Sequence, residues 1–317
     1  SQHQSIMKKT LICGSLAYDN IMVFNGRFRE QILPEQIHIL NVAFLVPEMR
    51  REFGGCAGNI AYALHSLGGH AEIMATVGED GIPYLDRLDA QGLSRQHVRK
   101  VPGIFTAQAF ITTDLDDNQI TAFHPGAMGQ AHLNEVGHAE NIGLGIVAPD
   151  GRDAMIEHAR QFADANIPFI FDPGQGLPMF DGDDLKQFLS LATYACVNDY
   201  EAQMLCDRTG QTLEQLAEQV AALIVTRGGE GAWIFTGGQR IDIESVQPEA
   251  IIDPTGCGDA FRGGLLYGIA NGFDWQKSGR LASLMGSIKI AQAGPQNYRV
   301  NLEQVAQRFQ AAFGEAL

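Results

Sequence analysis

The chain has 317 residues, of which 45% are hydrophobic, so it can bury the core of one large domain. Its 37 acidic residues outnumber its 22 basic residues, and the formal net charge of −15 argues against nucleic acid as a partner. No apolar run approaches the roughly 18 residues of a membrane-spanning helix, so we expect no membrane partner.

Short apolar runs rich in β-branched residues alternate with amphipathic segments along most of the chain. We expect buried strands at residues 10–15, 71–78, 143–149, 167–173, 194–199 and 222–229. Helical spacing of apolar residues predicts helices at residues 57–69, 151–166 and 213–221. This alternation predicts a single α/β domain over residues 7–317, built on a doubly wound, mainly parallel sheet whose ligands bind at the carboxyl ends of the strands. Residues 1–6 are set apart as an extension.

Two early regions do not follow this alternation. Residues 37–46 alternate in hydrophobicity like a strand, and residues 106–126 predict a hairpin that turns at residues 116–118. Because both carry apolar side chains that need a packing partner, we favour a small β-sheet lid made from segments of about 16–50 and 104–126. An edge extension of the main sheet is the alternative.

The cysteines indicate a reducing compartment. They are odd in number, scattered and without C-x-x-C spacing, which favours free thiols over disulfides or a zinc site. They are Cys13, Cys56, Cys196, Cys206 and Cys257. With no charged-then-apolar leader visible, we expect a cytoplasmic location.

The string DPTGCGDAFRGG, residues 253–264, indicates a phosphate site. The apolar residues after it have helical spacing, so Gly256, Cys257 and Gly258 would lie at a helix N-terminus, where unpaired N–H groups and the helix dipole attract anions. Asp259 in the same turn would repel a phosphate, but it fits a general base that takes a proton from an attacking hydroxyl. The alternative is a capped, glycine-rich helix start in which the aspartates only favour the dipole.

A second glycine-rich string, REFGGCAGN, precedes the helix predicted at 57–69. Asn59 would either cap this helix or, together with the Gly55 backbone, bind hydroxyl groups of a ligand. Asp19 also follows a predicted strand end. A carboxylate and a carboxamide together suit adjacent hydroxyls of a sugar.

Two further strings follow predicted strands in the second half of the chain. In NDYE, Asn198 and Glu201 match a reciprocal helix cap, and a magnesium site is the alternative. The loop TRGGEG, residues 226–231, fits either a plain hairpin turn or a nucleotide loop.

Taken in order, these strings resemble the ribokinase-like (PfkB-type) sugar and nucleoside kinases over nearly the whole chain. The resemblance implies that Asp259 is the catalytic base and that Gly256, Cys257 and Gly258 form the anion hole. It implies ribose binding by Asp19, Gly55 and Asn59, and Mg²⁺ held through water by Asn198 and Glu201. The ATP side would comprise Asn198, Thr226, Gly228, Gly231, Asp253 and Thr255. K⁺ bound by backbone near Asp253 is a further cofactor that the resemblance allows.

The stretches at residues 25–59, FHPGAMGQA (123–131) and AGPQNY (293–298) are similar to the bacterial adenosine kinases of this family. That similarity implies an apolar wall of Phe123 and Met128 against the purine, and a substrate contact by Gln175. Phe110 lies one residue from the expected lid aromatic, and a shift of one residue reverses the face of a strand, so its stacking on the purine stays open.

We therefore expect an ATP-dependent kinase that phosphorylates the 5′-hydroxyl of adenosine to give AMP and ADP. A ribokinase- or fructokinase-like sugar kinase is the first alternative, and a non-catalytic nucleoside-binding regulator is the second. The partners are small molecules, together with a second copy of the chain, because two lids packed across a two-fold axis would cover their apolar faces.

Overall fold

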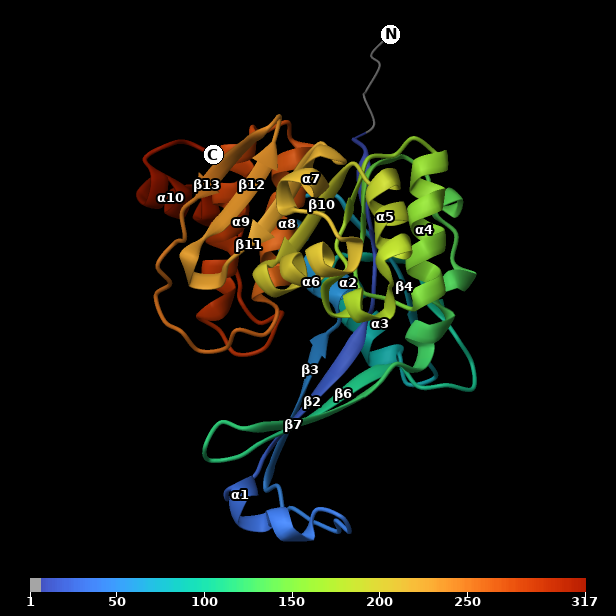
Figure 1. The fold of residues 1–317 in the computed structure, drawn as a ribbon, viewed down its shortest axis with the longest axis vertical. Coiled ribbons are helices and arrows are strands. Elements are labelled where there is room, and N and C mark those ends of the chain that lie inside the picture. Colours follow the sequence, from blue (N-terminus) through green and yellow to red (C-terminus); the bar gives the residue numbers. More distant parts are fainter. Residues whose placement is uncertain (1–6) are drawn as a thin grey trace.

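A computed structural model of the chain describes residues 7–317 (Figure 1). The residues set apart as an extension, 1–6, lie outside this described part. A nine-stranded sheet forms the centre, in the spatial order β13 (Gln239–Ile243), β12 (Ala232–Thr236), β11 (Ala222–Thr226), β10 (Tyr194–Asn198), β9 (Phe169–Phe171), β8 (Ile142–Val147), β1 (Lys9–Cys13), β4 (Ala71–Val77) and β5 (Ser94–Lys100). The strands from β11 to β5 pair in parallel. Within residues 7–317 the antiparallel pairs of this sheet are β11–β12 and β12–β13, so β12 alone is reversed and the predicted mainly parallel sheet is confirmed.

Helices cover both faces of this sheet because its strands are apolar on both sides. These helices are α2 (Cys56–Ser66), α3 (Ile82–Gln91), α4 (Arg152–Asp164), α5 (Gly182–Leu191), α6 (Asp199–Thr209), α7 (Leu213–Glu218), α8 (Cys257–Ala270), α9 (Trp275–Ile290) and α10 (Leu302–Phe313). The short helix α1 (Phe28–Gln31) lies away from the large sheet. Short 3₁₀ helices are η1 (Pro34–Gln36), η2 (Gly126–Leu133), η3 (Val136–His138), η4 (Gly174–Met179) and η5 (Gly228–Glu230).

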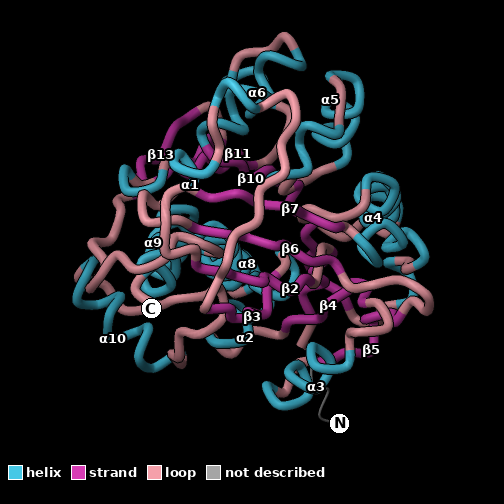
Figure 2. Tube along the Cα trace, turned by 90° about the horizontal axis from the view of Figure 1, so that it is seen from below, coloured by secondary structure: helices cyan, strands magenta, loops and turns pink. Residues whose placement is uncertain are grey.

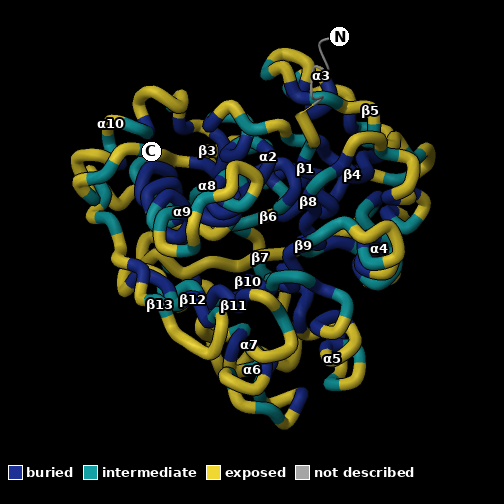
Figure 3. The backbone as a smooth tube through the Cα atoms, turned by 90° about the horizontal axis from the view of Figure 1, so that it is seen from above, coloured by how far each residue is buried: buried dark blue, intermediate teal, exposed yellow. Residues whose placement is uncertain are grey.

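Neighbouring residues of one strand enter two different cores. Ile12 of β1 belongs to the core that packs on α2 and α8, whereas Leu11 belongs to the core that packs on α4, α5 and α6. This follows from the two-residue period of a strand. Figure 3 shows central strands of the large sheet, such as β1 and β8, in the colour of buried residues. Within residues 7–317, no helix is both long and apolar enough to cross a bilayer.

The six strands predicted for the large sheet and the three helices predicted by residue range are present, with ends shifted by a few residues. The sequence did not predict β5, β12 or β13. The string of β5, SRQHVRK, is mostly polar and partly exposed, because β5 is an edge strand and buries less of its surface.

The small sheet is separate from the large one, as predicted. Its order is β3 (Glu48–Gly54), β2 (Ala17–Val23), β6 (Ala107–Thr113) and β7 (Gln119–His124). The hairpin of β6 and β7 is the one predicted at 106–126. Figure 1 shows this sheet projecting from one end of the molecule with α1 near its tip. Figure 2 shows its four strands side by side.

The strand predicted at residues 37–46 is wrong. That segment has no regular strand, and Ile37, Ile39 and Leu45 are 58%, 77% and 84% exposed. The strand that pairs with β2 on the outer side of the small sheet is instead β3, which does so along its whole length. Alternating hydrophobicity makes a strand only where a neighbour supplies the ladder, and residues 37–46 pair with none.

Candidate active site

The site lies where the order of the large sheet reverses. Strand β1 stands between β8 and β4, and the chain runs from its carboxyl end directly into β2 of the small sheet. Ligands of open α/β sheets bind at such reversal points. The small sheet therefore rises from the edge where the predicted site residues should meet.

Asp259 lies in the first turn of α8 and is half-buried. Burial raises the pKa of its carboxyl group to about 7; a hydrogen bond from Asn59 lowers it, and the negative charge of Asp172 raises it again. The carboxylate is thus close to half-ionised at neutral pH, which suits a general base.

Glycine at position 256 allows the tight turn into α8. Its φ is +82°, and a Cβ there would lie 2.7 Å from Cβ of Pro295. The Cys257 N–H donates to the Pro254 carbonyl at 3.1 Å, whereas within residues 7–317 the N–H groups of Gly256 and Gly258 have no acceptor. Of the three amides predicted for the anion hole, the Cys257 amide is therefore engaged by the turn, and those of Gly256 and Gly258 are available.

The Asn59 side chain connects the two glycine-rich strings. Its Nδ2 donates to Oδ2 of Asp259 at 2.9 Å, and its Oδ1 accepts from Nε2 of Gln296 at 2.9 Å. Gln296 also contacts the Tyr84 hydroxyl, which donates to the carbonyl of Gly54. Because Gln296 occupies the amide oxygen, the NH₂ group of Asn59 must point at the carboxylate. Asn59 therefore touches the predicted base, in addition to the ribose role expected from the sequence.

A buried ion pair holds the start of α8 against the large sheet. Nε of Arg262 lies 2.9 Å from Oδ2 of Asp172, and the two side chains are 7% and 3% exposed. The second guanidinium nitrogen, Nη1, donates to the Gly258 carbonyl at 3.0 Å. Sequence reasoning missed this pair, although the signals were present as the aspartate after β9 and the arginine within DPTGCGDAFRGG.

Asp253 and Thr255 belong to the turn that leads into α8. The Asp253 carboxylate accepts the N–H groups of Thr255 at 2.9 Å and Gly294 at 2.8 Å. Burial alone would raise the pKa of Asp253, but these backbone donors outweigh it and lower the pKa. Asp253 is thus an ionised structural anchor of the turn.

Asp19 lies on β2, and its carboxyl group has a pKa raised to about 6 by burial and by the charges of Glu52 and Asp253. A Cβ on Gly54 would lie 2.6 Å from Oδ2 of Asp19, so a larger residue there would displace the carboxylate from its present position. On the neighbouring Gly55, with φ of +88°, a Cβ would lie 2.5 Å from the Ser15 carbonyl oxygen. The predicted ribose contacts Asp19, Gly55 and Asn59 thus come from strand β2 and the start of α2.

Strand register decides which lid aromatic can face Asp19. Asp19 pairs with Ala109, and Ala109 pairs with Phe123, so Asp19 and Phe123 lie on one face of the small sheet. Phe110 pairs with Asn20 and lies on the other face. Phe110 therefore does not share the face of Asp19.

Met128 and Gln175 lie at the carboxyl ends of β8 and β9, which are neighbours in the large sheet. Met128 is half-buried in η2, and its carbonyl approaches Gly151, just past β8. Gln175 is exposed in η4, which follows β9. Met128 and Gln175 come from different segments, and the contact of either residue with a substrate stays a prediction.

The predicted nucleotide side is built from the ends of β10 and β11. Asn198 pairs directly with Thr226, and Gly228 and Gly231 follow with φ of +58° and +91°. Asn198 and Glu201 form the reciprocal helix cap: each side chain accepts the backbone N–H of the other. The second carboxylate oxygen of Glu201 remains for a metal-bound water. No cluster of three or more metal-ligating side chains occurs within residues 7–317.

The chain matches the pfkB carbohydrate kinase family model over residues 20–301. It belongs to this family. The observed fold and the chemistry of the site agree with this family. The protein is a phosphotransferase with a hydroxyl acceptor. The chain is 60% identical to a Burkholderia thailandensis nucleoside kinase solved with inosine, with 97% of this chain and 99% of that chain covered and a TM-score of 0.89. A Methanocaldococcus jannaschii nucleoside kinase is 29% identical over 310 residues, which cover 96% of this chain and 97% of the relative.

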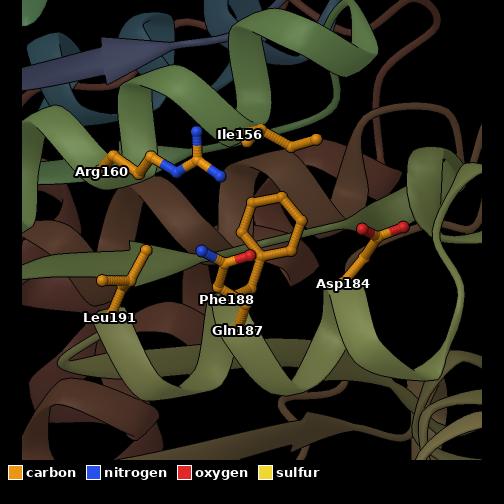
Figure 4. Close-up of a pocket in the computed structure, with 6 residues that line it drawn as sticks. All are labelled: Ile156, Arg160, Asp184, Gln187, Phe188 and Leu191. Carbon is orange, nitrogen blue, oxygen red and sulfur yellow. The ribbon is translucent and has the colours of Figure 1, made fainter.

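A shallow hollow between α4 and α5 contains none of these residues. It is lined by Ile156, Arg160, Asp184, Gln187, Phe188 and Leu191 (Figure 4). The side chains come from the outer layer of helices, away from the strand ends, so we assign the hollow no part in the kinase reaction.

Proposed function

We propose that this kinase transfers the γ-phosphoryl group of ATP to the 5′-hydroxyl of a purine nucleoside, adenosine in the first place, giving the nucleoside monophosphate and ADP. The observation that carries the proposal is Asp259, held by Asn59 beside the free amides at the start of α8. The relative that is 60% identical to this chain was solved with inosine, and also in an ADP–inosine form. Inosine is therefore the second acceptor to test.

The residues support a division of labour. Asp259 would accept the proton of the attacking hydroxyl, while the amides of Gly256 and Gly258 stabilise the charge on the transferred group. Arg262 would keep the Gly258 peptide in place through its bond to the carbonyl. Asp19 would orient the ribose, because an ionised carboxylate accepts hydrogen bonds from hydroxyl groups.

Mg²⁺ fits this site as a companion of ATP. Magnesium keeps several waters and needs few protein carboxylates, and Glu201 offers one free carboxylate oxygen beside the cap it forms. When bound, the ion would neutralise charge on the phosphates. Asn198 uses its oxygen on the cap, so its contribution would be to hold Glu201 in position.

The chemistry of the small sheet favours a nucleoside over a free sugar. Phe123, on the face of Asp19, is 52% exposed and would cover an apolar base, for which a free sugar has no counterpart. A product assay with ATP and a panel of adenosine, inosine, guanosine, ribose and fructose tests this. Phosphorylation of ribose or fructose in preference to all nucleosides would replace the proposal by the sugar kinase, and binding without any turnover would favour the regulator.

The outer face of the small sheet supports a homodimer. Met49, Phe110 and Ile120 lie on the face opposite Asp19 and are 69%, 42% and 44% exposed. A second copy would cover them, because exposed apolar sheet faces are a liability in a monomer.

The five free cysteines support a cytoplasmic location.

A further inference from the structure

Lys289 is a fully buried lysine in the last turn of α9. Its side chain is 0% exposed, which is rare for lysine unless the ammonium group has partners. The ammonium Nζ donates to the carbonyl oxygens of Asp253 at 2.6 Å and Gln292 at 2.9 Å. Both are backbone oxygens, and neither belongs to a carboxylate.

The two carbonyls belong to the loops that surround the start of α8. Asp253 begins the turn that leads to Gly256, and Gln292 follows α9. The same turn is fastened by N–H groups of Ile252 and Asp253, which donate to the Ile290 carbonyl at 2.8 and 3.1 Å. Lys289 therefore ties the turn of residues 253–256 to the end of α9, next to the two backbone bonds that this turn makes to the Ile290 carbonyl.

A positive charge at this position has a cost and a benefit. Burial lowers the pKa of Lys289, while the negative charge of Asp253 acts to raise it. An apolar side chain such as methionine would fill the same space without the desolvation cost. What the ammonium group adds is a cation held by backbone carbonyls, next to the turn that must bind the phosphoryl anion.

We propose that Lys289 is a positioning residue that acts as a tethered monovalent cation, so that this kinase needs no free K⁺ at the Asp253 turn. The role in phosphoryl transfer rests on the function proposed above. The ammonium group donates hydrogen bonds to the carbonyl oxygens of Asp253 and Gln292 and keeps the turn in the conformation that presents the Gly256 and Gly258 amides. A free cation near Asp253 would have to share the space that Nζ occupies.

The test compares wild type with Lys289→Ala and Lys289→Met in sodium, potassium, ammonium and choline chloride at equal ionic strength. Thermal unfolding without substrate is the first measurement, and kcat with ATP and the best nucleoside is the second. Wild type should show the same Tm and kcat in all four salts. Lys289→Met, which keeps the length of the stem, should lose kcat about 100-fold, because misplacing a reacting group by about 1 Å costs that much.

Lys289→Ala should lose kcat as well, and ammonium or potassium should restore part of the loss and raise Tm relative to choline. A cation that binds only the folded protein must stabilise it, and a purely structural lysine would give no such ion selectivity. Lys186→Ala removes a positive charge from the exposed surface of α5 and serves as the control.

Two results would overturn the proposal. One is a wild-type kcat or Tm that rises in potassium over sodium and choline. The other is a Lys289→Met protein with wild-type kcat and stability in every salt. If no acceptor is phosphorylated by wild type, the proposed function fails, but the unfolding measurements on Lys289→Ala still decide whether the lysine replaces a cation.

Discussion

The hydrogen bond between Asn59 and Asp259 should set the pH at which the kinase becomes active. Replacing Asn59 by alanine removes the donor 2.9 Å from the carboxylate of Asp259. Burial raises the pKa of Asp259 to about 7, and the Asn59 bond is the largest influence that lowers it. Without that bond the pKa should rise further.

The size of the shift follows from the strength of the bond. A hydrogen bond to a charged group is worth about 1.5–3 kcal/mol, and one pKa unit corresponds to about 1.4 kcal/mol. The pKa of Asp259 should therefore rise by about 1 to 2 units in Asn59→Ala. Because the base works in its ionised form, kcat/KM should increase with pH, with a midpoint near the pKa of the free enzyme.

The assay is ADP production measured as kcat/KM across the pH range, on wild type and Asn59→Ala. We expect a wild-type midpoint near 7 and a midpoint moved upward in the variant. Gln296→Leu should move it in the same direction by less, because it only frees the Asn59 amide to rotate. Asn271→Ala, at the opposite end of α8, is the control. An unmoved midpoint in Asn59→Ala, or one moved to lower pH, would refute the assignment of Asp259 as the base.

Three further outcomes are expected. Asp259→Asn should lower kcat by roughly 10²–10⁴. Because the pKa of Asp259 is raised on folding, its ionised carboxylate destabilises the folded protein increasingly as the pH rises towards 7. The same variant should therefore melt at a higher temperature than wild type in alkaline buffer. Calorimetry should show that Asp19→Ala weakens nucleoside binding by roughly 1.5–3 kcal/mol and leaves ATP binding nearly unchanged, whereas equal losses would point to misfolding. Light scattering should give twice the 34.4 kDa chain mass for wild type and the single mass for a Met49→Lys, Ile120→Lys double variant; a monomeric wild type would disprove the dimer.

Local patterns were enough for the six parallel strands from β11 to β4 and for the start of α8. Continuous apolar strands separated by amphipathic segments specify a buried parallel sheet, because both of its faces must be covered. Helix α8, which begins at Cys257 inside DPTGCGDAFRGG, was likewise predictable from the helical spacing of the apolar residues that follow. The strand prediction failed at residues 37–46 because the alternating pattern was present there without a neighbouring strand to pair with.

Most of what supports Asp259 was decided only by the tertiary structure. Asn59 and Asp259 are 200 positions apart, Gln296 is 237 positions from Asn59, and Asp172 is 90 positions from Arg262. The sequence singled out Asn59 and Asp259, but it could not say that they touch, and it did not single out Gln296, Asp172 or Arg262. The register that puts Phe123 with Asp19, and Phe110 behind them, also depends on strand pairing. Local periodicity is set by the backbone of a few successive residues, whereas a hydrogen-bond partner is chosen by the packing of elements far apart in the chain.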